Sequence, residues 1–178
     1  LANIDPDFEH GLNVSTFAVI FAMAFGRIER GLLADLAYAG LIHDIGMCQI
    51  PAEVTDKTWK AFGPEDLSIY SGHVDAGIAI VNFFASPSSA APSDPSAQDP
   101  GKIIVPDRVK SIMSQHHEKF DGTGYPRAYK GFQVDDISQL LAIADILDSF
   151  ASGQWDGERR TLAQTFDLLE GLEKARTF

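Results

Sequence analysis

The sequence predicts an all-α fold, a bundle of roughly six to seven helices. Apolar residues recur at spacings of three and four along most of the chain, which is the period of a helix with one buried face. Helix-start signals precede several of these stretches, and no segment alternates apolar and polar residues as a half-buried strand would. The 178 residues and their 45% hydrophobic content suit one core, so we expect residues 1–178 to form a single domain.

Proline, acidic and hydroxyl residues mark the starts of several expected helices. Pro64 and Pro106 are each followed by acids, which is typical of a first helical turn near the positive end of the dipole. Thr161 and Gln164 have the spacing of a capping box. The apolar stripe of that last helix is Leu162, Phe166, Leu169 and Leu172. The expected helices are 10–25, 30–45, 64–84, 106–117, 137–150 and a last one after Thr161.

Residues 85–105 break the helical pattern. The segment is rich in Ser, Pro and Ala and has almost nothing to bury, so we expect a disordered insertion. Candidate site residues lie on both sides of it, which favours an insertion within one domain over a domain boundary. The chain begins at Leu1 without an initiator Met, and we expect it to be a piece of a longer protein.

Composition restricts the class of partner. The formal charge of −11 and the pI near 4.7 argue against a DNA or RNA polymer and against an anionic membrane surface. The longest apolar run, 17–26, is about half the length of a bilayer span, so we expect no membrane segment. Cys48 is the only cysteine, which excludes an internal disulfide and fits a reducing, cytoplasmic location for this domain.

All five histidines occur where a set of metal ligands would need them. Imidazole and carboxylate bind divalent transition metals, and an aspartate inside an apolar helix is costly unless it is paired or metal-bound. Any one of these histidines alone would more often be an ordinary core or surface residue. The joint pattern favours metal binding. Its members are His10, His43 with Asp44, His73, His116 with His117, and Asp145.

Asp44 is the candidate catalytic residue of this set. An adjacent His-Asp pair at a helix end can grip one metal from two directions, and the carboxylate of Asp44 can bridge to a second metal. Two-metal sites activate water and neutralise charge on a phosphoryl group, so phosphate ester hydrolysis is the natural reaction class. Mixed nitrogen and oxygen ligands suit Fe, Mn, Ni or Zn better than Ca or Mg.

Longer motifs around these ligands carry a resemblance to a known family. They closely resemble the HD-GYP family, the cyclic di-GMP phosphodiesterases of the HD superfamily, over about residues 10–148. The motif that ends in Gly-Tyr-Pro is very specific, whereas an isolated His-Asp pair would be weak. The matching stretches are His43-Asp44-Ile45-Gly46, Ile50-Pro51, the run from His116 to Pro126 that ends in Gly124-Tyr125-Pro126, and Ala144-Asp145.

The resemblance implies an HD-type bundle with two divalent ions, Fe or Mn first, with Zn and Ni as other candidates. By this resemblance, His43, Asp44 and Asp145 would hold one metal, and His10 would be a further ligand of undecided metal. The second metal would be held by Asp44, His73, His116 and His117. Family members with three metals carry a glutamate where this chain has Pro6, which favours two. A metal-bound hydroxide would then open cyclic di-GMP, or a related cyclic dinucleotide, to pGpG or GMP.

Two departures from the family pattern affect the groups that hold phosphate. Met47 stands where the family usually has a lysine that contacts the scissile phosphate, and a thioether cannot replace that charge. An arginine-containing stretch that usually follows the equivalent of Asp145 is also absent. Arg127, Arg159 or Arg160 could substitute, although a solvated surface charge is an equal interpretation of each.

Four residues complete the candidate substrate site: Tyr125, Gly124, Asp148 and Met47. Tyr125 and Gly124 belong to a loop that in the family lies beside the metals and is linked to docking of GGDEF-domain proteins; a purely structural turn is an equal interpretation. Asp148 could hydrogen-bond a ligand histidine, with a helix-surface acid as the favoured alternative. Trp155 could stack on a guanine, but a half-buried core aromatic is favoured.

The leading hypothesis is a metal-dependent cyclic dinucleotide phosphodiesterase. The alternative is a weakly active or inactive module that binds metal and nucleotide or docks a GGDEF domain, because Met47 replaces the lysine. A third is an HD hydrolase for another phosphoester, since the fold alone does not set the substrate. A homodimer is a further candidate assembly.

Overall fold

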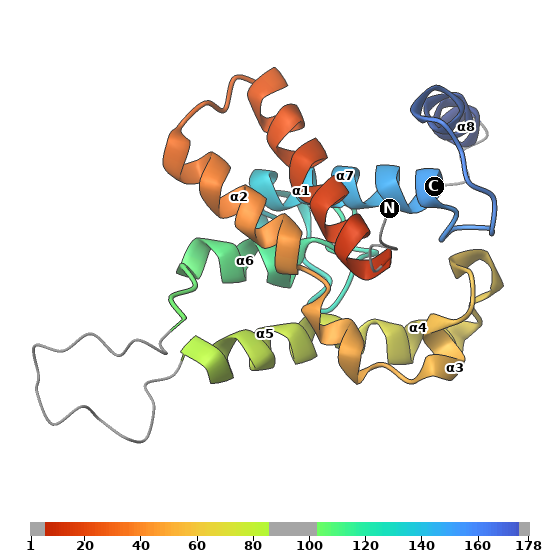
Figure 1. Cartoon of the computed structure of the whole chain (residues 1–178), viewed down its shortest axis with the longest axis horizontal. Coiled ribbons are helices and arrows are strands. Elements are labelled where there is room, and N and C mark those ends of the chain that lie inside the picture. The colour runs from red at the N-terminus through yellow and green to blue at the C-terminus, as the bar shows by residue number, and fades with distance from the viewer. Residues whose placement is uncertain (1–5, 86–102, 175–178) are drawn as a thin grey trace, which may run out of the picture.

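Helices form every regular element of the computed structural model within the residues it describes, 6–85 and 103–174 (Figure 1). This confirms the predicted all-α class. The α-helices are α1 (Pro6–Ala24), α2 (Arg30–Ile42), α3 (Ala52–Thr55), α4 (Pro64–Tyr70), α5 (Gly72–Ala85), α6 (Asp107–Gln115), α7 (Asp136–Ser152) and α8 (Leu162–Lys174). Short 3-10 helices are η1 (Ile45–Gln49), η2 (Trp59–Ala61) and η3 (Gly131–Gln133).

The core lies where α1, α2, α6 and α7 meet. Helix α1 packs against α2 and α7, and α6 packs against α2, α5 and α7. Small side chains on α1 and α2 let these helices approach closely, while larger ones from α6 and α7 fill the centre. Full burial of each Leu or Ile stabilises the fold by roughly 1.5–3 kcal/mol. The central residues are Val14, Ala18, Ala22, Leu36, Ala39, Val109, Ile112, Met113, Leu141 and Ala144.

The expected helix over 64–84 is wrong as one continuous element. The structure divides it into α4 and α5, with Ser71 between them. The Tyr70 carbonyl, which ends α4, accepts a hydrogen bond from the His73 ring at 2.6 Å, and Gly72 has low helix propensity. The break therefore turns His73 toward the centre of the bundle. Helix α3 and the 3-10 helices were not predicted, because they are too short to show a period.

The structure describes only the ends of the predicted insertion. Residues 86–102 lie outside the described residues, but Ala85 is the last residue of α5 and Val105 is buried in the core. The two end residues are thus placed in the structure, and the insertion between them stays a prediction. The assignment of 1–178 to a single domain, and to a piece of a longer protein, stays a prediction.

Helix α8 begins as predicted but buries less than expected. The Thr161 amide donates to Gln164 Oε1 at 2.9 Å, and the Gln164 amide donates to Thr161 Oγ1 at 3.3 Å, which is a capping box. However, Leu162 and Phe166 are exposed, whereas Thr165 is buried. The Leu172 side chain lies outside the described residues. Helix α8 contacts α7 and stands at the edge of the bundle (Figure 1), which explains the exposed stripe.

Among the described residues, no helix combines the length and the apolar character that crossing a membrane requires.

Candidate metal centre and its pocket

The ends of several helices converge on one point in the bundle. His43 follows the last residue of α2 and is followed by Asp44, while His73 stands in the first turn of α5. His116 and His117 follow α6 directly. These residues are far apart in the sequence. In the structure they meet His10 from α1 and Asp145 from α7.

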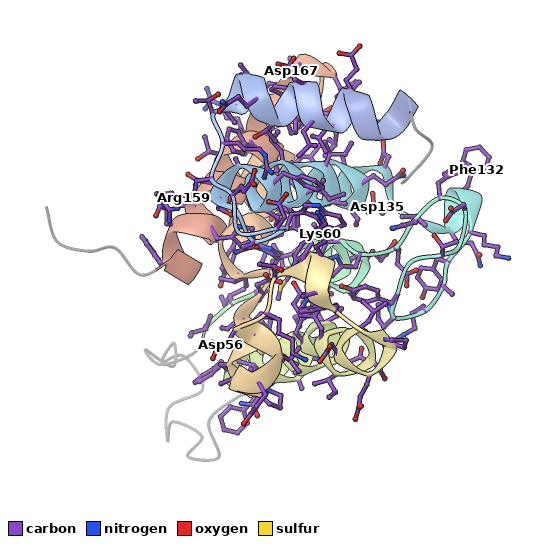
Figure 2. All side chains as sticks on the ribbon, turned by 90° about the vertical axis from the view of Figure 1, so that its right-hand side faces the viewer. Asp56, Lys60, Phe132, Asp135, Arg159 and Asp167 are labelled. Atoms are coloured by element: carbon purple, nitrogen blue, oxygen red, sulfur yellow. The ribbon has the colours of Figure 1, made fainter. Side chains whose placement is uncertain are left out.

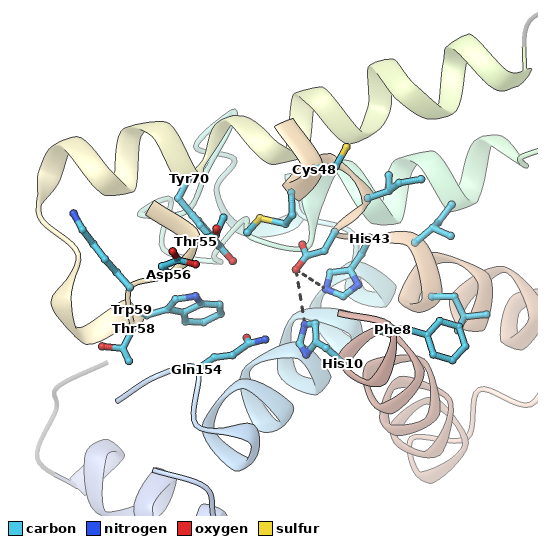
Figure 3. A pocket seen from close by; sticks show the side chains of 17 residues that line it. Phe8, His10, His43, Cys48, Thr55, Asp56, Thr58, Trp59, Tyr70 and Gln154 are labelled. Atoms are coloured by element: carbon cyan, nitrogen blue, oxygen red, sulfur yellow. Dashed lines mark ion pairs between the residues drawn. The ribbon is translucent and has the colours of Figure 1, made fainter. Parts of the chain in front are cut away.

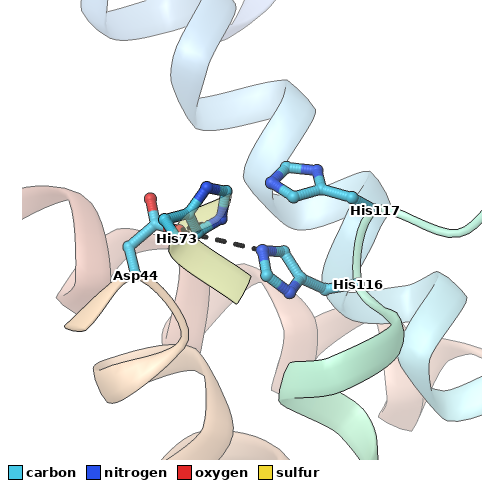
Figure 4. Close-up of side chains that lie close together, drawn as sticks. All are labelled: Asp44, His73, His116 and His117. Carbon is cyan, nitrogen blue, oxygen red and sulfur yellow. Dashed lines mark ion pairs between the residues drawn. The ribbon is translucent and has the colours of Figure 1, made fainter. Parts of the chain in front are cut away.

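The seven predicted ligands form two neighbouring groups. Within each group, one candidate ligand atom per residue lies within 4.8 Å of the others. The first group is His10, His43 and Asp145, and the second is Asp44, His73, His116 and His117 (Figure 4). His10, whose metal the sequence left undecided, therefore joins the first group. The resemblance implied that His43, Asp44 and Asp145 hold one metal. In the structure, His43 and Asp145 belong to the first group, whereas Asp44 belongs to the second and lies next to the first.

Asp44 faces both groups with different oxygen atoms. Its Oδ1 lies 3.3 Å from His73 Nε2 and 3.7 Å from His116 Nε2. Its Oδ2 lies 3.5 Å from His43 Nε2 and 3.8 Å from His10 Nε2. A carboxylate in this position can bind one cation through each oxygen, which is the geometry of a bridging ligand.

The histidine rings are oriented by hydrogen bonds on their far side. Nδ1 of His43 is 2.9 Å from the Gly40 carbonyl, and Nδ1 of His116 is 2.6 Å from the Met113 carbonyl. His73 makes the same contact with the carbonyl three residues earlier in the chain. Because a carbonyl only accepts, each Nδ1 donates to it, which leaves each Nε2 directed at the centre. This arrangement is typical of metal-ligating histidines.

The atoms that face the centre have no hydrogen-bond partner in the described residues. Unpartnered buried polar atoms are costly, and here they cluster at one place instead of being scattered. Divalent cations would satisfy all of them, so the donor set fits a metal centre. The atoms are Nε2 of His10, His43, His73, His116 and His117, and Oδ1 of Asp44.

Electrostatics in the cluster keep the carboxylates charged. Burial alone would raise the pKa of Asp44, but His43, His116 and His73 hold that pKa well below its usual value. Burial opposes the charged form of His10, yet the carboxylates of Asp145, 3.3 Å from Nε2, and of Asp148, 2.7 Å from Nδ1, raise its pKa to about 10. Without metal, the carboxylates of the cluster therefore favour a positive charge on His10.

In two other ligand candidates, burial outweighs the neighbouring carboxylates. It lowers the pKa of His43 from its ordinary value and lowers that of His117 well below it. Both rings are therefore neutral at neutral pH, which is the form that binds metal. The pKa of Tyr70 and of Tyr125 is raised well above the ordinary value, chiefly by burial.

Gly46 allows the His-Asp turn to reach α5. A Cβ at this position would lie 2.0 Å from the His73 carbonyl oxygen and 2.5 Å from the Gly77 nitrogen. Any larger residue would push η1 away from α5. The glycine after the His-Asp pair therefore sets the distance between Asp44 and His73.

Gly124 and Tyr125 support the centre from the loop after α6. A Cβ at Gly124 would lie 2.4 Å from both the His117 carbonyl oxygen and the Lys119 nitrogen. The Tyr125 ring packs on the His117 ring with centroids 4.6 Å apart. Buried Glu118 holds the loop exit by accepting backbone hydrogen bonds from Arg127 and Tyr129. Neither Gly124 nor Tyr125 lines the pocket described next, and their substrate contact stays a prediction.

A pocket of about 840 Å³ opens beside the metal ligands (Figure 3). Its size lies within the range of roughly 300–1,000 Å³ typical of small-molecule sites. His10, His43, Asp44 and Met47, which the sequence predicted as metal or substrate residues, line one part of it. The remaining lining includes residues that sequence reasoning missed, namely Lys57, Trp59, Tyr70 and Gln154.

Cations near the site differ in their freedom to bind phosphate. Arg127 pairs with Asp75, and Arg160 is held by Asp156, so both are already engaged. Arg159 is exposed on the connection before α8 (Figure 2) and lines a smaller pocket that also includes His10. Lys57 lines the main pocket, and its ammonium group contacts Asp66 at 2.6 Å.

Asp148 is buried and not a surface acid, which corrects the favoured interpretation of the sequence. Its Oδ2 lies 2.7 Å from His10 Nδ1, and its Oδ1 accepts a hydrogen bond from Asn13 at 2.9 Å. It also lines the smaller pocket. Trp155 stacks on Phe150 with centroids 4.9 Å apart and does not line the main pocket, in agreement with a half-buried structural aromatic.

Comparison with known proteins agrees with the helical architecture. The HD domain of the L. monocytogenes phosphodiesterase PgpH superposes with a TM-score of 0.59 at 17% identity, covering 96% of this chain and 78% of that one. At this identity the likeness concerns the fold alone. The two chains thus share the helical bundle in which the candidate metal ligands of this chain lie.

Curated relatives are similar over most of this chain. It is 26% identical over 147 residues to the 3'3'-cGAMP-specific phosphodiesterase 1 of Vibrio cholerae, covering 83% of this chain and 29% of that protein. It is 27% identical over 153 residues to a cyclic di-GMP phosphodiesterase of Thermotoga maritima, covering 83% and 37%. The 3'3'-cGAMP-specific phosphodiesterase 3 of Vibrio cholerae is 43% identical over 117 residues, covering 66% and 21%.

The chain thus spans between 21% and 37% of the length of these relatives. The family model described as HD domain matches residues 27–177, which is most of the chain. The protein therefore belongs to the HD domain family, as its His-Asp motif predicted.

Proposed function

We propose that this domain hydrolyses a cyclic dinucleotide, cyclic di-GMP or 3'3'-cGAMP, to the linear dinucleotide or to mononucleotides. The observation that carries the proposal is the cluster of unpartnered histidine nitrogens around Asp44 at the edge of a pocket of ligand size. Curated relatives named as phosphodiesterases for these two substrates support the choice of substrate class.

Two divalent ions fit the two ligand groups, with Fe or Mn as the first candidates and Zn or Ni as others. Bound there, they would supply Lewis-acid chemistry, stabilising charge on a phosphodiester and activating water at neutral pH. Each ion would have at least three side-chain ligands from this chain. Asp44 would belong to both sites.

The protein's own groups define where the phosphodiester can bind. Asp44 and His10 face the pocket, so a phosphate that reaches the cluster enters from that side. The buried carbonyl contacts of His43, His73 and His116 keep their rings fixed while substrate binds and product leaves. Asp44 is the proposed catalytic residue, because its carboxylate lies between the two ligand groups and would help to hold the metals that act on the phosphate.

Met47 lines the pocket beside these ligands and offers no charge to phosphate. Lys57 is the cation that lines the same pocket, and exchange of its Asp66 contact for a substrate phosphate would partly replace the missing lysine. We therefore propose slow turnover with substrate held mainly by the metals. Substrate contacts by Tyr125, Gly124 and Asp148 remain part of this proposal.

The test is turnover with metal quantification in one preparation. Protein purified without oxygen and loaded with Fe(II) or Mn(II) is expected to convert cyclic di-GMP or 3'3'-cGAMP to linear products. Asp44→Asn should abolish conversion, because it removes the shared charged ligand. Asp167→Asn, an exposed substitution on α8 (Figure 2), is the matched control. Protein with two bound metals that leaves both dinucleotides intact would refute the proposal.

A second candidate function is a regulatory module that binds the dinucleotide without turning it over. It is favoured by Met47, which lines the pocket without offering a charge to phosphate. Calorimetry that shows binding to metal-loaded protein with no product would favour it. Docking of a GGDEF-domain protein, a homodimer and a cytoplasmic location stay predictions.

A further inference from the structure

The wall of the main pocket that faces the metal ligands carries an indole ring. Trp59 is half-buried on η2 and lines the pocket together with Gln154. Figure 3 shows Trp59 on the side of the pocket opposite His10 and His43, with Gln154 between it and His10. A ligand that extends from the candidate metal ligands to the opposite wall of this pocket would lie beside the indole.

Two backbone hydrogen bonds fix η2 in this place. The Trp59 amide donates to the Gln154 carbonyl at 3.1 Å, and the Lys60 amide donates to the Trp155 carbonyl at 2.9 Å. They attach η2 to the connection that follows α7, the helix that carries Asp145. The position of the indole relative to the metal ligands is thus set by main-chain contacts and not by a mobile loop.

Aromatic contacts connect the indole to the cluster. The Trp59 ring meets Tyr70 with centroids 5.9 Å apart and planes at 67°. Tyr70 in turn meets His73 with centroids 4.8 Å apart. The two ring planes are inclined at 67°, so Tyr70 does not stack face to face on the indole. The pocket wall opposite the candidate metal ligands therefore carries an aromatic ring on which a base could stack.

We infer that Trp59 stacks on a nucleobase of the substrate and that the Gln154 side-chain amide donates to the edge of the same base; the inference rests on the proposed function. Gln154 Oε1 accepts from Ser149 Oγ at 3.1 Å, so its amide nitrogen is the group that remains to donate. Stacking accepts any base, whereas the amide distinguishes base edges. The pair is thus a specificity site separate from the metal ligands.

Trp155 provides the matched control for Trp59. It is the other of the two tryptophans in the chain, and its ring is stacked on Phe150 outside the main pocket. Trp155→Phe keeps an aromatic ring against Phe150 and leaves Trp59 as the single indole fluorophore. In that variant, cyclic di-GMP or 3'3'-cGAMP should quench or shift the emission, whereas inorganic phosphate, which has no base, should not.

Steady-state kinetics give the second readout. Trp59→Leu removes the aromatic face and should raise KM by roughly 5- to 150-fold, the effect expected for loss of one base stack, with little change in kcat. Trp59→Phe should recover most of that loss, and Trp155→Phe should leave KM near the wild-type value. Metal content should be the same in all three variants, because none of them changes a ligand.

The outcomes separate this inference from the proposed function. If the protein binds and cleaves the dinucleotide while the emission of Trp59 and the KM of Trp59→Leu stay unchanged, the stacking role is wrong and the phosphodiesterase proposal stands. If Trp59→Leu fails to fold, the emission of Trp155→Phe still decides. If metal-loaded wild-type protein neither binds nor cleaves either dinucleotide, both proposals fall.

Discussion

Replacement of Asp148 tests whether the two ligand groups are separate metal sites. Asp148 does not belong to either group, but its carboxylate lies 2.7 Å from His10 Nδ1 and orients that ring. Asp148→Asn preserves the size of the side chain and one acceptor oxygen while it removes the charge. We expect the site of His10, His43 and Asp145 to weaken and the site around His73 to stay intact.

The expected size follows from the contacts of Asp148. Both of its oxygens are used, one by His10 and the other by Asn13, and an amide has only one acceptor to offer. One of the two donors must therefore lose its partner inside a buried site. Loss of such a support for a metal-bound histidine typically weakens metal affinity by roughly 10- to 100-fold.

Calorimetric titration with Mn(II) measures the two sites in one experiment. The wild type is expected to bind two equivalents of Mn(II). Asp148→Asn should bind one equivalent with unchanged affinity and the other roughly 10- to 100-fold more weakly. Asp167→Asn, on exposed α8, is the control, and thermal unfolding of each variant checks the fold. Two equivalents with wild-type affinities in Asp148→Asn would refute the separate role of His10.

Three further predictions concern phosphate binding, packing and pH. Met47→Lys should lower KM, or raise kcat/KM, by the factor that corresponds to about 1–3 kcal/mol of binding free energy, the contribution of one charge-assisted hydrogen bond. No change in either constant with intact metals would place the phosphate elsewhere. Gly124→Ala should destabilise the protein by roughly 1–3 kcal/mol in urea unfolding, because its Cβ would meet backbone atoms, while Gly31→Ala, with open space around it, should not. In metal-free protein the pKa of His10 is raised to about 10, so protonated His10 stabilises the folded state. This stabilisation is fully present below pH 6.5 and is lost as the pH rises through about 10. The melting temperature should therefore fall over that interval more than in His10→Gln; equal pH profiles would contradict this.

The sequence identified the set of candidate ligands but not how they divide into groups. Histidine and aspartate at helix ends are recognisable by residue type, and the structure brings all seven of them together. Which group His10 joins depends on how α1 packs against α7, and that packing has no signature in local sequence. The hydrogen bond of Asp148 to a ligand histidine was considered but ranked below a surface acid for the same reason, since its partner His10 lies 138 residues away.

The helices were predictable where they are long. Periodicity located α1, α2, α6, α7 and α8, because each repeats its apolar pattern over several turns. The break at Ser71 and the short η2 have no such pattern, since they are set by tertiary contacts. Trp59 begins η2, and Lys57 lies just before it in the connection from α3. This stretch has no periodic pattern, which explains why the pocket wall was not predicted.

The carbonyl contacts of His43, His73 and His116 make helix termination part of the metal centre. Each ring caps the last turn of the helix that precedes it, so unwinding of that turn would release the ring as well. The time that a metal stays bound is then limited by how often these turns open, and bound metal should slow amide exchange there. The durability of the centre would thus be governed by backbone opening at three helix ends as much as by the ligand atoms themselves.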